Sequence, residues 1–460
     1  MPVSLDYTNM LAPTVAGGVP ADAWAQAAAR FRVAHESVRA LRATGTLGFY
    51  DLPGDSALLA QSERFAAERK GRYTDVVVLG IGGSALGPVA LRTALRPSGW
   101  NSLGAEAREG YPALHVLDNV DPVTIDALLA RLDLRRTLFI VTSKSGGTAE
   151  TMAQFLVVNE RLAAAGLPLG DHVVFVTDPS KGALRPLVKP LGVAALDIPA
   201  NVGGRFSVLT PVGILPAALI GVDVRGLLAG AGAMAARCET EDFARNPAGV
   251  YALLQYLADS TAGKRLHVFM PYSDPLRDFA AWFVQLWAES LGKHRPDGTS
   301  VGPTPIAALG ATDQHAQVQL FMEGPADKTV TFVSVKDRGV DVKIPALHAD
   351  VPELAYLGGH SLGELIDIEQ RATAGALARR GRPNMTLHLD RVDAAHVGEL
   401  MMLLEIATAY AGALYGIDAF NQPGVELGKQ FAYAMLGRAD AGAARAEWEQ
   451  LPKPDPARRV

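Results

Sequence analysis

The chain has 460 residues, 49% of them hydrophobic, which is more than a single core usually supports and predicts two or more domains. A net charge of −5 without any Lys/Arg-rich run argues against a nucleic-acid-binding role. The single cysteine, Cys238, cannot form an intrachain disulfide, and the amino terminus lacks a signal-peptide pattern. The most apolar stretch, 208–224, contains two prolines and is too short for a membrane span. We therefore expect a soluble, cytoplasmic protein without a membrane partner.

The chain begins with Ala-rich helical segments over 22–70 and then changes pattern. From Thr74 onwards, short β-branched runs alternate with helical segments, which is typical of βαβ units in a parallel sheet. We predict strands over 75–79, 114–117, 137–142, 173–177 and 194–198, and a second series over 266–271, 305–309, 330–335 and 385–389.

These two series predict an α/β fold with two doubly wound parallel-sheet domains and flanking helices. We place the first α/β domain at 71–200, a connecting segment at 201–244 and the second α/β domain at 245–440. The helical segment 1–70 is expected to pack on the second domain, and 441–460 to form an exposed tail.

A glycine-rich turn, Gly80-Ile-Gly-Gly83-Ser84, follows the first predicted strand and precedes a helix. Such a turn exposes backbone N–H groups at a helix amino terminus and is a natural anion site, although a tight turn without a ligand has the same composition. It also loosely matches a dinucleotide-binding fingerprint. That alternative requires an acidic residue about 20 residues further on, and Asp118 lies too far along the chain.

A second loop, Ser143-Lys144-Ser145-Gly-Gly-Thr148, follows the predicted strand 137–142 and also leads into a helix. Its hydroxyls and lysine suit the oxygens of a compact phosphomonoester, although Ser and Thr are also ordinary helix caps. Two such loops on the carboxyl edge of one sheet favour a ligand site.

Glu289 is the candidate general base. It lies in an apolar helical run that we expect to end near Gly292, and Gln285, four residues earlier, shares its helical face. The negative end of a helix dipole makes a carboxylate a stronger base, although a glutamate at a helix end is usually only solvated.

His315 is a candidate acid–base group because Thr312 is a plausible helix N-cap, which places His315 in the first turn of a helix. There the dipole favours the neutral imidazole. Most histidines are structural, so the pattern alone leaves both readings open.

Arg205 follows Gly203-Gly204, whose missing side chains permit close approach of a ligand. It is either half of a structural ion pair or a cation that stabilises an oxyanion. Pro423 is expected to open the last long helix, with Gln422 and Lys429 on roughly one stripe. The chain contains no HExxH motif and no Cys/His cluster, so we predict no metal and no other cofactor.

Two segments, 201–213 and 412–429, closely resemble the signature segments of the glucose-6-phosphate isomerase family, in its bacterial form, and the similarity extends over most of the chain. The resemblance implies a sugar-isomerase fold and interconversion of glucose 6-phosphate and fructose 6-phosphate through a cis-enediolate. It implies that Glu289 is the base, that Arg205 stabilises the enediolate, and that His315 and Lys429 open the sugar ring. It further implies a homodimer in which His315 reaches the neighbouring subunit's active site. The residues implied to hold the sugar phosphate are Gly83, Ser84, Ser143, Lys144, Ser145, Thr148, Gly204, Gln285 and Gln422; Gly147 replaces the family's usual threonine.

Three alternatives compete with this resemblance. A non-catalytic sugar-phosphate-binding protein would need the hydroxyl-rich loop but not Glu289, His315 and Lys429. A nicotinamide-dependent dehydrogenase would not explain the second loop. The Gly359-His-Ser361-Leu-Gly363 segment matches the hydrolase nucleophile elbow, but no convincing strand precedes it, and Ser361 with Glu364 is better interpreted as a helix capping box.

Overall fold

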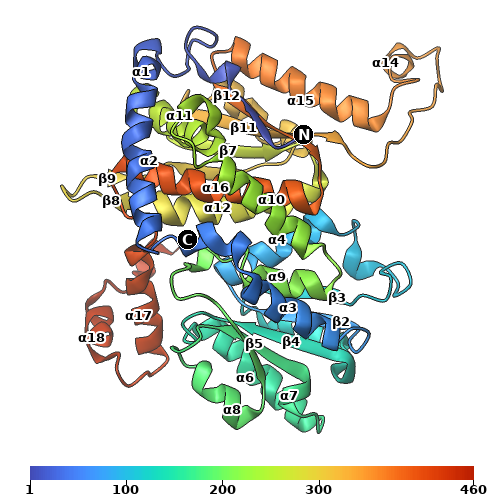
Figure 1. Ribbon diagram of the computed structural model, residues 1–460, viewed down its shortest axis with the longest axis vertical. Helices are drawn as coiled ribbons and strands as arrows, with labels where there is room; N and C mark the ends of the chain where they lie inside the picture. Colours follow the sequence, from blue (N-terminus) through green and yellow to red (C-terminus); the bar gives the residue numbers. More distant parts are fainter. Residues whose placement is uncertain (460) are drawn as a thin grey trace.

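The computed structural model describes residues 1–459 and contains two five-stranded sheets, one in each half of the molecule (Figure 1). The first sheet is wholly parallel, with the order β3-β2-β4-β5-β6. Its strands are β2 (Asp75–Leu79), β3 (Ala113–Leu117), β4 (Thr137–Thr142), β5 (Val173–Thr177) and β6 (Ala194–Asp197). The central strands are buried on both faces, as their continuous apolar sequences predict.

The order of these strands places a topological switch point between β2 and β4. The chain passes from β2 outwards to β3 and then returns to the other side of β2 with β4. In doubly wound sheets, ligands bind outside the carboxyl ends of the two strands that flank such a point. The predicted loops after β2 and β4 both lie there. The helices of this half are α4 (Leu86–Leu95), α5 (Pro122–Arg131), α6 (Ala149–Ala164), α7 (Leu169–His172) and α8 (Val188–Leu191).

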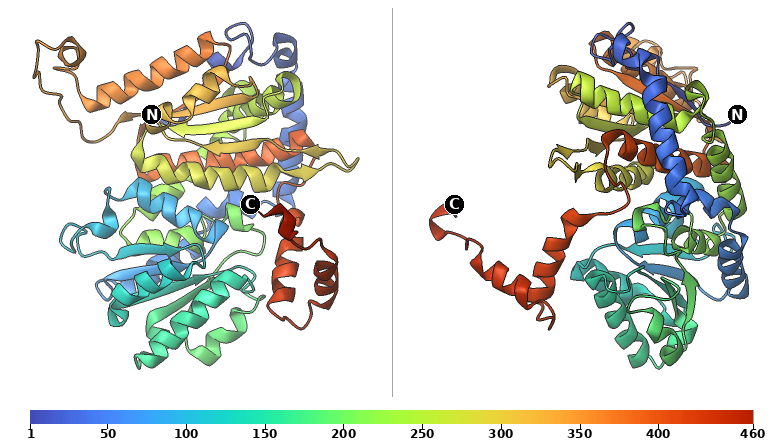
Figure 2. Two further views of the ribbon diagram at one scale, coloured as in Figure 1. Left: turned by 180° about the vertical axis from the view of Figure 1, so that it is seen from behind. Right: turned by 60° about the vertical axis from the view of Figure 1, so that its left-hand side comes forward.

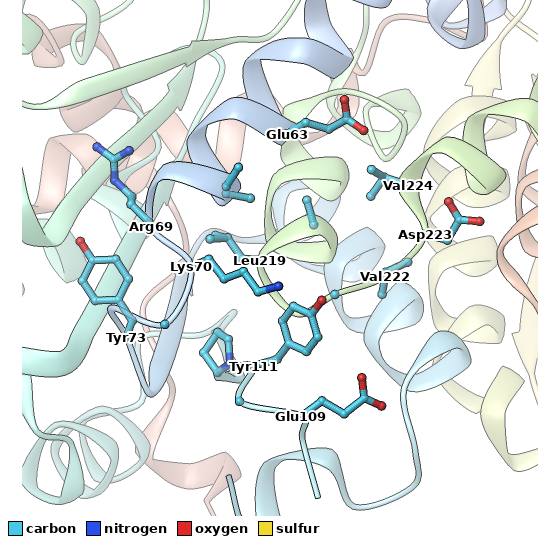
Figure 3. A pocket seen from close by; sticks show the side chains of 17 residues that line it. Glu63, Arg69, Lys70, Tyr73, Glu109, Tyr111, Leu219, Val222, Asp223 and Val224 are labelled. Atoms are coloured by element: carbon cyan, nitrogen blue, oxygen red, sulfur yellow. The ribbon is translucent and has the colours of Figure 1, made fainter. Parts of the chain in front are cut away.

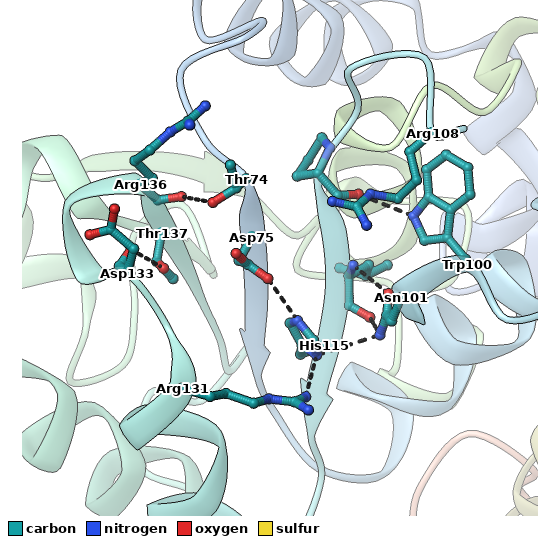
Figure 4. Close-up of polar contacts among 12 residues, drawn as sticks. Thr74, Asp75, Trp100, Asn101, Arg108, His115, Arg131, Asp133, Arg136 and Thr137 are labelled. Atoms are coloured by element: carbon teal, nitrogen blue, oxygen red, sulfur yellow. Dashed lines mark hydrogen bonds and ion pairs between the residues drawn. The ribbon is translucent and has the colours of Figure 1, made fainter. Parts of the chain in front are cut away.

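Strand β3 pairs with β2 on one side, and polar side chains rather than a further strand contact its outer edge (Figure 4). Asn101 bonds both the N–H and the C=O of Leu114, as a neighbouring strand does. The ring Nε2 of His115 lies 3.0 Å from the Asp75 carboxylate on β2, and Arg131 of α5 approaches Nδ1 at 3.4 Å. The Asn101 bonds cover the outer edge of the sheet, whereas the His115 contacts join β3 to β2 and to α5.

The second sheet has the order β1-β12-β11-β7-β10, and its last four strands are parallel. The strands are β1 (Ser4–Asp6), β7 (Leu266–Pro271), β10 (Thr304–Ala307), β11 (Lys328–Asp337) and β12 (Asn384–Arg391). The two sheets confirm the predicted α/β fold. Strand β1 was not predicted, because its three residues carry no strand pattern of their own and are held only by antiparallel pairing with β12.

The helices of this half are α11 (Pro247–Ala262), α12 (Arg277–Leu291), α13 (Val318–Glu323), α14 (Pro352–Ala355) and α15 (Leu362–Arg379). The Ser361 hydroxyl caps α15 by accepting the N–H of Glu364 at 3.1 Å, and α14 rather than a strand precedes it. Ser361 is therefore the N-cap of α15, but the reciprocal half of the predicted capping box is not formed, because the Glu364 carboxylate bonds the His360 ring instead. The segment before Ser361 also lacks the strand that a nucleophile elbow requires.

A long buried helix, α16 (Ala394–Tyr415), lies between the two halves of the molecule (Figure 1) and packs against α10 (Val224–Arg237), α11 and α12. Its length and composition would allow it to cross a membrane, but 89% of its most apolar window is buried inside the protein. A Cβ atom on Gly230 of α10 would lie 1.9 Å from the Ala395 carbonyl oxygen, so the close approach of α10 and α16 requires glycine there.

The amino-terminal helices are α1 (Ala21–Ala25), α2 (Ala27–Ala43) and α3 (Ser56–Glu68). Helix α2 lies against α16 and α11, whereas α3 lies against α9 (Pro211–Leu219) and touches β6. The placement of α3 differs from the expectation that all of 1–70 packs on the second domain. The apolar face of α3, which includes Leu58 and Phe65, predicts burial but does not reveal which surface covers it.

The carboxyl-terminal helices, α17 (Glu426–Met435) and α18 (Gly442–Gln450), project away from the rest of the chain (Figure 2). They pack on each other, with the rings of Phe431 and Trp448 5.4 Å apart. Part of the predicted exposed tail, 441–460, is therefore helical. The Tyr433 hydroxyl donates a hydrogen bond of 3.2 Å to the Gly147 carbonyl, which links α17 to the loop after β4.

Candidate active site

Arg205 is buried and held in one orientation by four hydrogen bonds. Its side chain is only 2% exposed. Nε donates to the Ser290 hydroxyl at 2.7 Å, and Nη1 donates to the Gln422 side-chain oxygen at 3.1 Å. Nη2 donates to the backbone carbonyls of Ala419 and Asn421. Burial lowers the pKa of Arg205, while the carboxylates of Glu289 and Asp418 act in the opposite direction. The result is a preorganised guanidinium cation.

Glu289 lies beside this cation near the end of α12, which ends at Leu291 before Gly292, as predicted. Its Oε2 accepts a hydrogen bond of 3.1 Å from Gln285 and lies 3.9 Å from Arg205 Nη1. The glutamate side chain is 27% exposed, so solvent or a ligand reaches it. A partly open carboxylate that is oriented by a neutral amide has the geometry of a general base.

The glycine-rich turn after β2 packs directly against these groups. A Cβ atom on Gly82, whose φ is 58°, would lie 2.9 Å from Gln285 Nε2. A Cβ atom on Gly83 would lie 2.2 Å from the Gly204 carbonyl oxygen. Glycine at these positions therefore permits contact between the turn, α12 and the segment that carries Arg205. Ser84 ends this turn and is partly exposed.

The loop after β4 is arranged around its hydroxyl groups. Ser143 is buried, lies 3.1 Å from the Thr148 hydroxyl and accepts the N–H of Gly146. Ser145 is exposed and accepts the N–H of Gly147. These side chains order the loop at the amino terminus of α6, where the helix dipole favours an anion.

The Lys144 ammonium group points to backbone carbonyls rather than outwards. Nζ donates to the oxygens of Ala200 and Val202 at 2.7 and 2.8 Å. Burial lowers the pKa of Lys144. Lys144 therefore connects the loop after β4 to the segment that leads into Gly203 and Gly204. The glycine-rich turn after β2 contacts the same segment through Gly83, so both loops are anchored beside Arg205.

His315 and Lys429 lie outside this cluster within the single chain. His315 is exposed at the end of a 3₁₀ turn, Thr312–His315, and within residues 1–459 it makes no contact with Glu289, Arg205 or Lys429 that qualifies as a hydrogen bond or ion pair. The interpretation of Thr312 as an N-cap is wrong: the turn begins after Ala311, and the Thr312 hydroxyl caps nothing. Lys429 is exposed and pairs with Glu426 at 2.9 Å.

The predicted helical stripe for Gln422 and Lys429 is also wrong. Pro423 opens a 3₁₀ turn, Pro423–Val425, and α17 begins only at Glu426, so Gln422 lies before the helix. This irregular segment directs Gln422 to Arg205 instead.

Several contacts in the cluster were missed by the sequence reasoning. Ser290 accepts from Arg205, and Lys293 donates to the carbonyls of Glu289 and Ser290. Both residues lie close to Glu289 in the sequence, so the sequence indicates their place in the site but not their hydrogen-bond partners. The bonds of Arg205 to the backbone carbonyls of Ala419 and Asn421 could not be predicted, because these acceptors do not depend on the side chain.

A separate cavity of about 470 Å³ lies at the opposite, amino-terminal edge of the first sheet (Figure 3). Gly71 and Tyr73 before β2 and Tyr111 and Pro112 before β3 line it. None of the predicted site residues does, so this cavity is not the candidate active site. Residues 1–459 contain no group of three or more His, Cys, Asp or Glu side chains arranged to hold a metal.

The two sheets and the polar cluster are those of an α/β enzyme, and similarity to known proteins makes it an isomerase. Residues 60–451 match the family model for phosphoglucose isomerase, and the chain belongs to that family. It is 44% identical to the glucose-6-phosphate isomerase of Carboxydothermus hydrogenoformans over 97% of both chains. It is 45% identical to that of Rubrobacter xylanophilus, over 95% of this chain and 98% of that one.

Two solved structures resemble most of the chain. A hypothetical protein from Thermus thermophilus superposes with a TM-score of 0.85 at 38% identity, covering 95% of this chain and all (100%) of that one. A glucose-6-phosphate isomerase from Chlamydia trachomatis superposes with a TM-score of 0.74 at 25% identity, covering 85% and 75% of the two chains.

Proposed function

We propose that this chain interconverts glucose 6-phosphate and fructose 6-phosphate without a metal, as a step of glycolysis and gluconeogenesis in the cytoplasm. The observation that carries the proposal is the pairing of an accessible carboxylate, Glu289, with a buried cation, Arg205, that is oriented by four hydrogen bonds. The names of the curated relatives give the substrate class.

In the proposed reaction, Glu289 removes the proton from C2 of the open-chain aldose and returns it to C1. A cis-enediolate forms between these steps, and its negative charge develops on the sugar oxygens. Arg205 supports this role because its guanidinium is already desolvated and oriented, so that stabilising the oxyanion requires little reorganisation. Gln285 keeps the carboxylate directed at the substrate.

The phosphate is proposed to bind at the switch point between β2 and β4. Ser84, Ser143, Ser145 and Thr148 supply hydroxyl groups, and the amino terminus of α6 supplies a favourable potential. Lys144 contributes chiefly by holding the two loops together, because its ammonium group is engaged by the carbonyls of Ala200 and Val202. Gly83 allows the two segments to meet, because a Cβ atom there would lie 2.2 Å from the Gly204 carbonyl oxygen.

Ring opening is assigned to His315 and Lys429, and it requires a homodimer. His315 is exposed on the second domain and is not directed at Glu289 of its own chain by any hydrogen bond. A second subunit that presents His315 to the site would complete the acid–base set. Lys429 is exposed on the projecting helix α17 (Figure 2), and it is proposed to join the site together with His315 in the homodimer.

The direct test supplies fructose 6-phosphate to the purified chain in the presence of EDTA and measures glucose 6-phosphate. We expect rapid conversion that EDTA does not reduce. Absence of product would refute the assigned reaction, and activity that is lost with EDTA and restored by a divalent cation would refute its metal-free character.

A further inference from the structure

Lys293 makes two hydrogen bonds at the carboxyl end of α12, the helix that carries Glu289. Its Nζ donates to the carbonyl oxygen of Glu289 at 2.6 Å and to that of Ser290 at 2.9 Å. The last carbonyls of a helix have no partner within the helix, and a cation there is favoured by the helix dipole. Lys293 therefore holds the backbone of the base itself.

The position of Lys293 is fixed by the chain that follows the helix. It lies in β8 (Lys293–His294), which pairs with β9 (Ser300–Val301) in a short hairpin. Gly302, with φ of 123°, allows this hairpin to pack closely against the helix end, because a Cβ atom there would lie 2.5 Å from the Leu291 carbonyl oxygen. The ammonium group is thus held at the helix end by a segment that packs against it.

Two cations form hydrogen bonds with Ser290, the residue that follows Glu289. Arg205 bonds the Ser290 hydroxyl, and Lys293 bonds the Ser290 carbonyl. Burial and then the charge of Arg205 lower the pKa of Lys293 to about 8, against the opposing influence of the carboxylates of Asp418 and Glu289. Lys293 is half-buried, so its charge is felt within the site rather than screened by solvent.

We propose that Lys293 is a positioning residue for the isomerase reaction: it fixes the backbone of Glu289 and adds positive charge beside the enediolate. This inference rests on the proposed function of Glu289 and Arg205. It assigns to Lys293 more than a helix-capping role, because a cap stabilises the fold whereas a charge beside the reacting atoms also changes the rate.

The titration of Lys293 gives the proposal a pH signature. The ammonium form supplies both the hydrogen bonds and the charge, and it is lost as the pH rises through about 8. An arginine at this position stays protonated in that range. The wild-type rate should therefore fall on the alkaline side, and the fall should move to higher pH when arginine replaces lysine.

The experiment compares wild type, Lys293→Met and Lys293→Arg with fructose 6-phosphate from pH 6 to 10, together with each protein's melting temperature. We expect Lys293→Met to lower kcat about tenfold at pH 7 with KM changed less than about twofold, as for an interaction made chiefly in the transition state. We expect Lys293→Arg to recover most of the rate and to keep it above pH 8. Lys336→Met serves as the control, because Lys336 is exposed and makes no ion pair within residues 1–459.

Unchanged kcat and pH profile in Lys293→Met, with only a lower melting temperature, would show that Lys293 is a helix cap and would overturn the proposal. An alkaline fall that stays in place in Lys293→Arg would also overturn it, and this variant decides the question if Lys293→Met does not fold. If wild type itself does not convert fructose 6-phosphate, the proposed function fails first, and this inference fails with it.

Discussion

Glu289 Oε2 and Arg205 Nη1 lie 3.9 Å apart, too far for a hydrogen bond, although both side chains are oriented by other groups. Gln285 directs the carboxylate, while Ser290 and Gln422 direct the guanidinium. A tight ion pair would neutralise the base and the cation together. The observed separation leaves the carboxylate free to take a proton while the positive charge stays beside it.

Replacing Glu289 by Gln should reduce kcat by about two to four orders of magnitude, which is the usual contribution of a general base. The amide keeps the shape of the side chain and can still bond Gln285, so the fold should be retained. The assay is isomerase turnover together with exchange of the substrate C2 proton into solvent. Glu353→Gln, which alters an exposed glutamate of α14 that makes no ion pair within residues 1–459, is the control. Near-normal proton exchange in Glu289→Gln would assign the base elsewhere.

Replacing Arg205 by Lys should lower both activity and stability although the charge is kept. A lysine cannot reproduce the bonds to Ser290, Gln422 and the two carbonyls at once. Leaving buried acceptors without partners costs about 1–3 kcal/mol each. Losing a preorganised donor to an oxyanion lowers kcat by about 10²–10³. Denaturant unfolding and steady-state kinetics measure the two effects, and wild-type stability in this variant would show that the hydrogen bonds contribute little.

Replacing Ser143 by Ala should raise KM for fructose 6-phosphate more strongly than replacing Ser145 does. Ser143 is buried and shares a hydrogen bond with Thr148, whereas Ser145 is exposed. We expect about a tenfold increase in KM for Ser143→Ala, the effect of losing one hydrogen bond to a charged group. Inhibition by inorganic phosphate should weaken in parallel. A larger effect from Ser145→Ala would mean that the exposed side of the loop holds the phosphate.

The strands of the fold could be predicted because their signal is local. The boundaries of β2, β4, β5 and β7 follow directly from continuous β-branched and apolar runs. Strand β1 and the docking of α3 could not be predicted in the same way, because each depends on a surface formed by residues far away in the sequence.

In the candidate site, too, contacts between neighbouring residues could be predicted from the sequence and contacts between distant residues could not. Gln285 and Glu289 lie on one helical face, so a spacing of four residues predicted their contact. The contact of Arg205 with Gln422 joins residues 217 positions apart and was not predicted, since family resemblance implies only that both residues belong to the site. The helical stripe for Gln422 and Lys429 failed because a 3₁₀ turn separates Gln422 from α17.

Mixing two inactive variants should restore activity if His315 acts across a subunit interface. His315→Ala retains Glu289, and Glu289→Gln retains His315, so a hybrid dimer contains one complete site and one site that lacks both groups. Random exchange of subunits should then recover about a quarter of wild-type activity, since half of the dimers are hybrids and each has one of two sites intact. Each variant refolded alone is the control. If exchanged mixtures stay inactive while mass spectrometry detects the hybrid, His315 acts within its own chain or not at all.

Replacing Glu405 by Gln should stabilise the protein, and more so at pH 8 than at pH 5. Glu405 lies inside α16, is completely buried, and neither carboxylate oxygen has a hydrogen-bond partner within the described residues. Burial raises the pKa of Glu405 well above its ordinary value. The folded state therefore keeps the proton, whereas the unfolded state releases it above about pH 4.3. Because the unfolded state binds fewer protons, stability falls as the pH rises, and the neutral amide removes this penalty.

Glu399→Gln on the same helix is a control for which the opposite change in stability is expected. The Glu399 carboxylate accepts the N–H of Val3 at 2.6 Å and lies 3.6 Å from Arg237, so its removal should lower the melting temperature at neutral pH. Melting temperatures of wild type and both variants between pH 5 and 8 measure the effect. A difference between Glu405→Gln and wild type that does not change with pH would mean that Glu405 ionises in place, with its charge compensated inside the core.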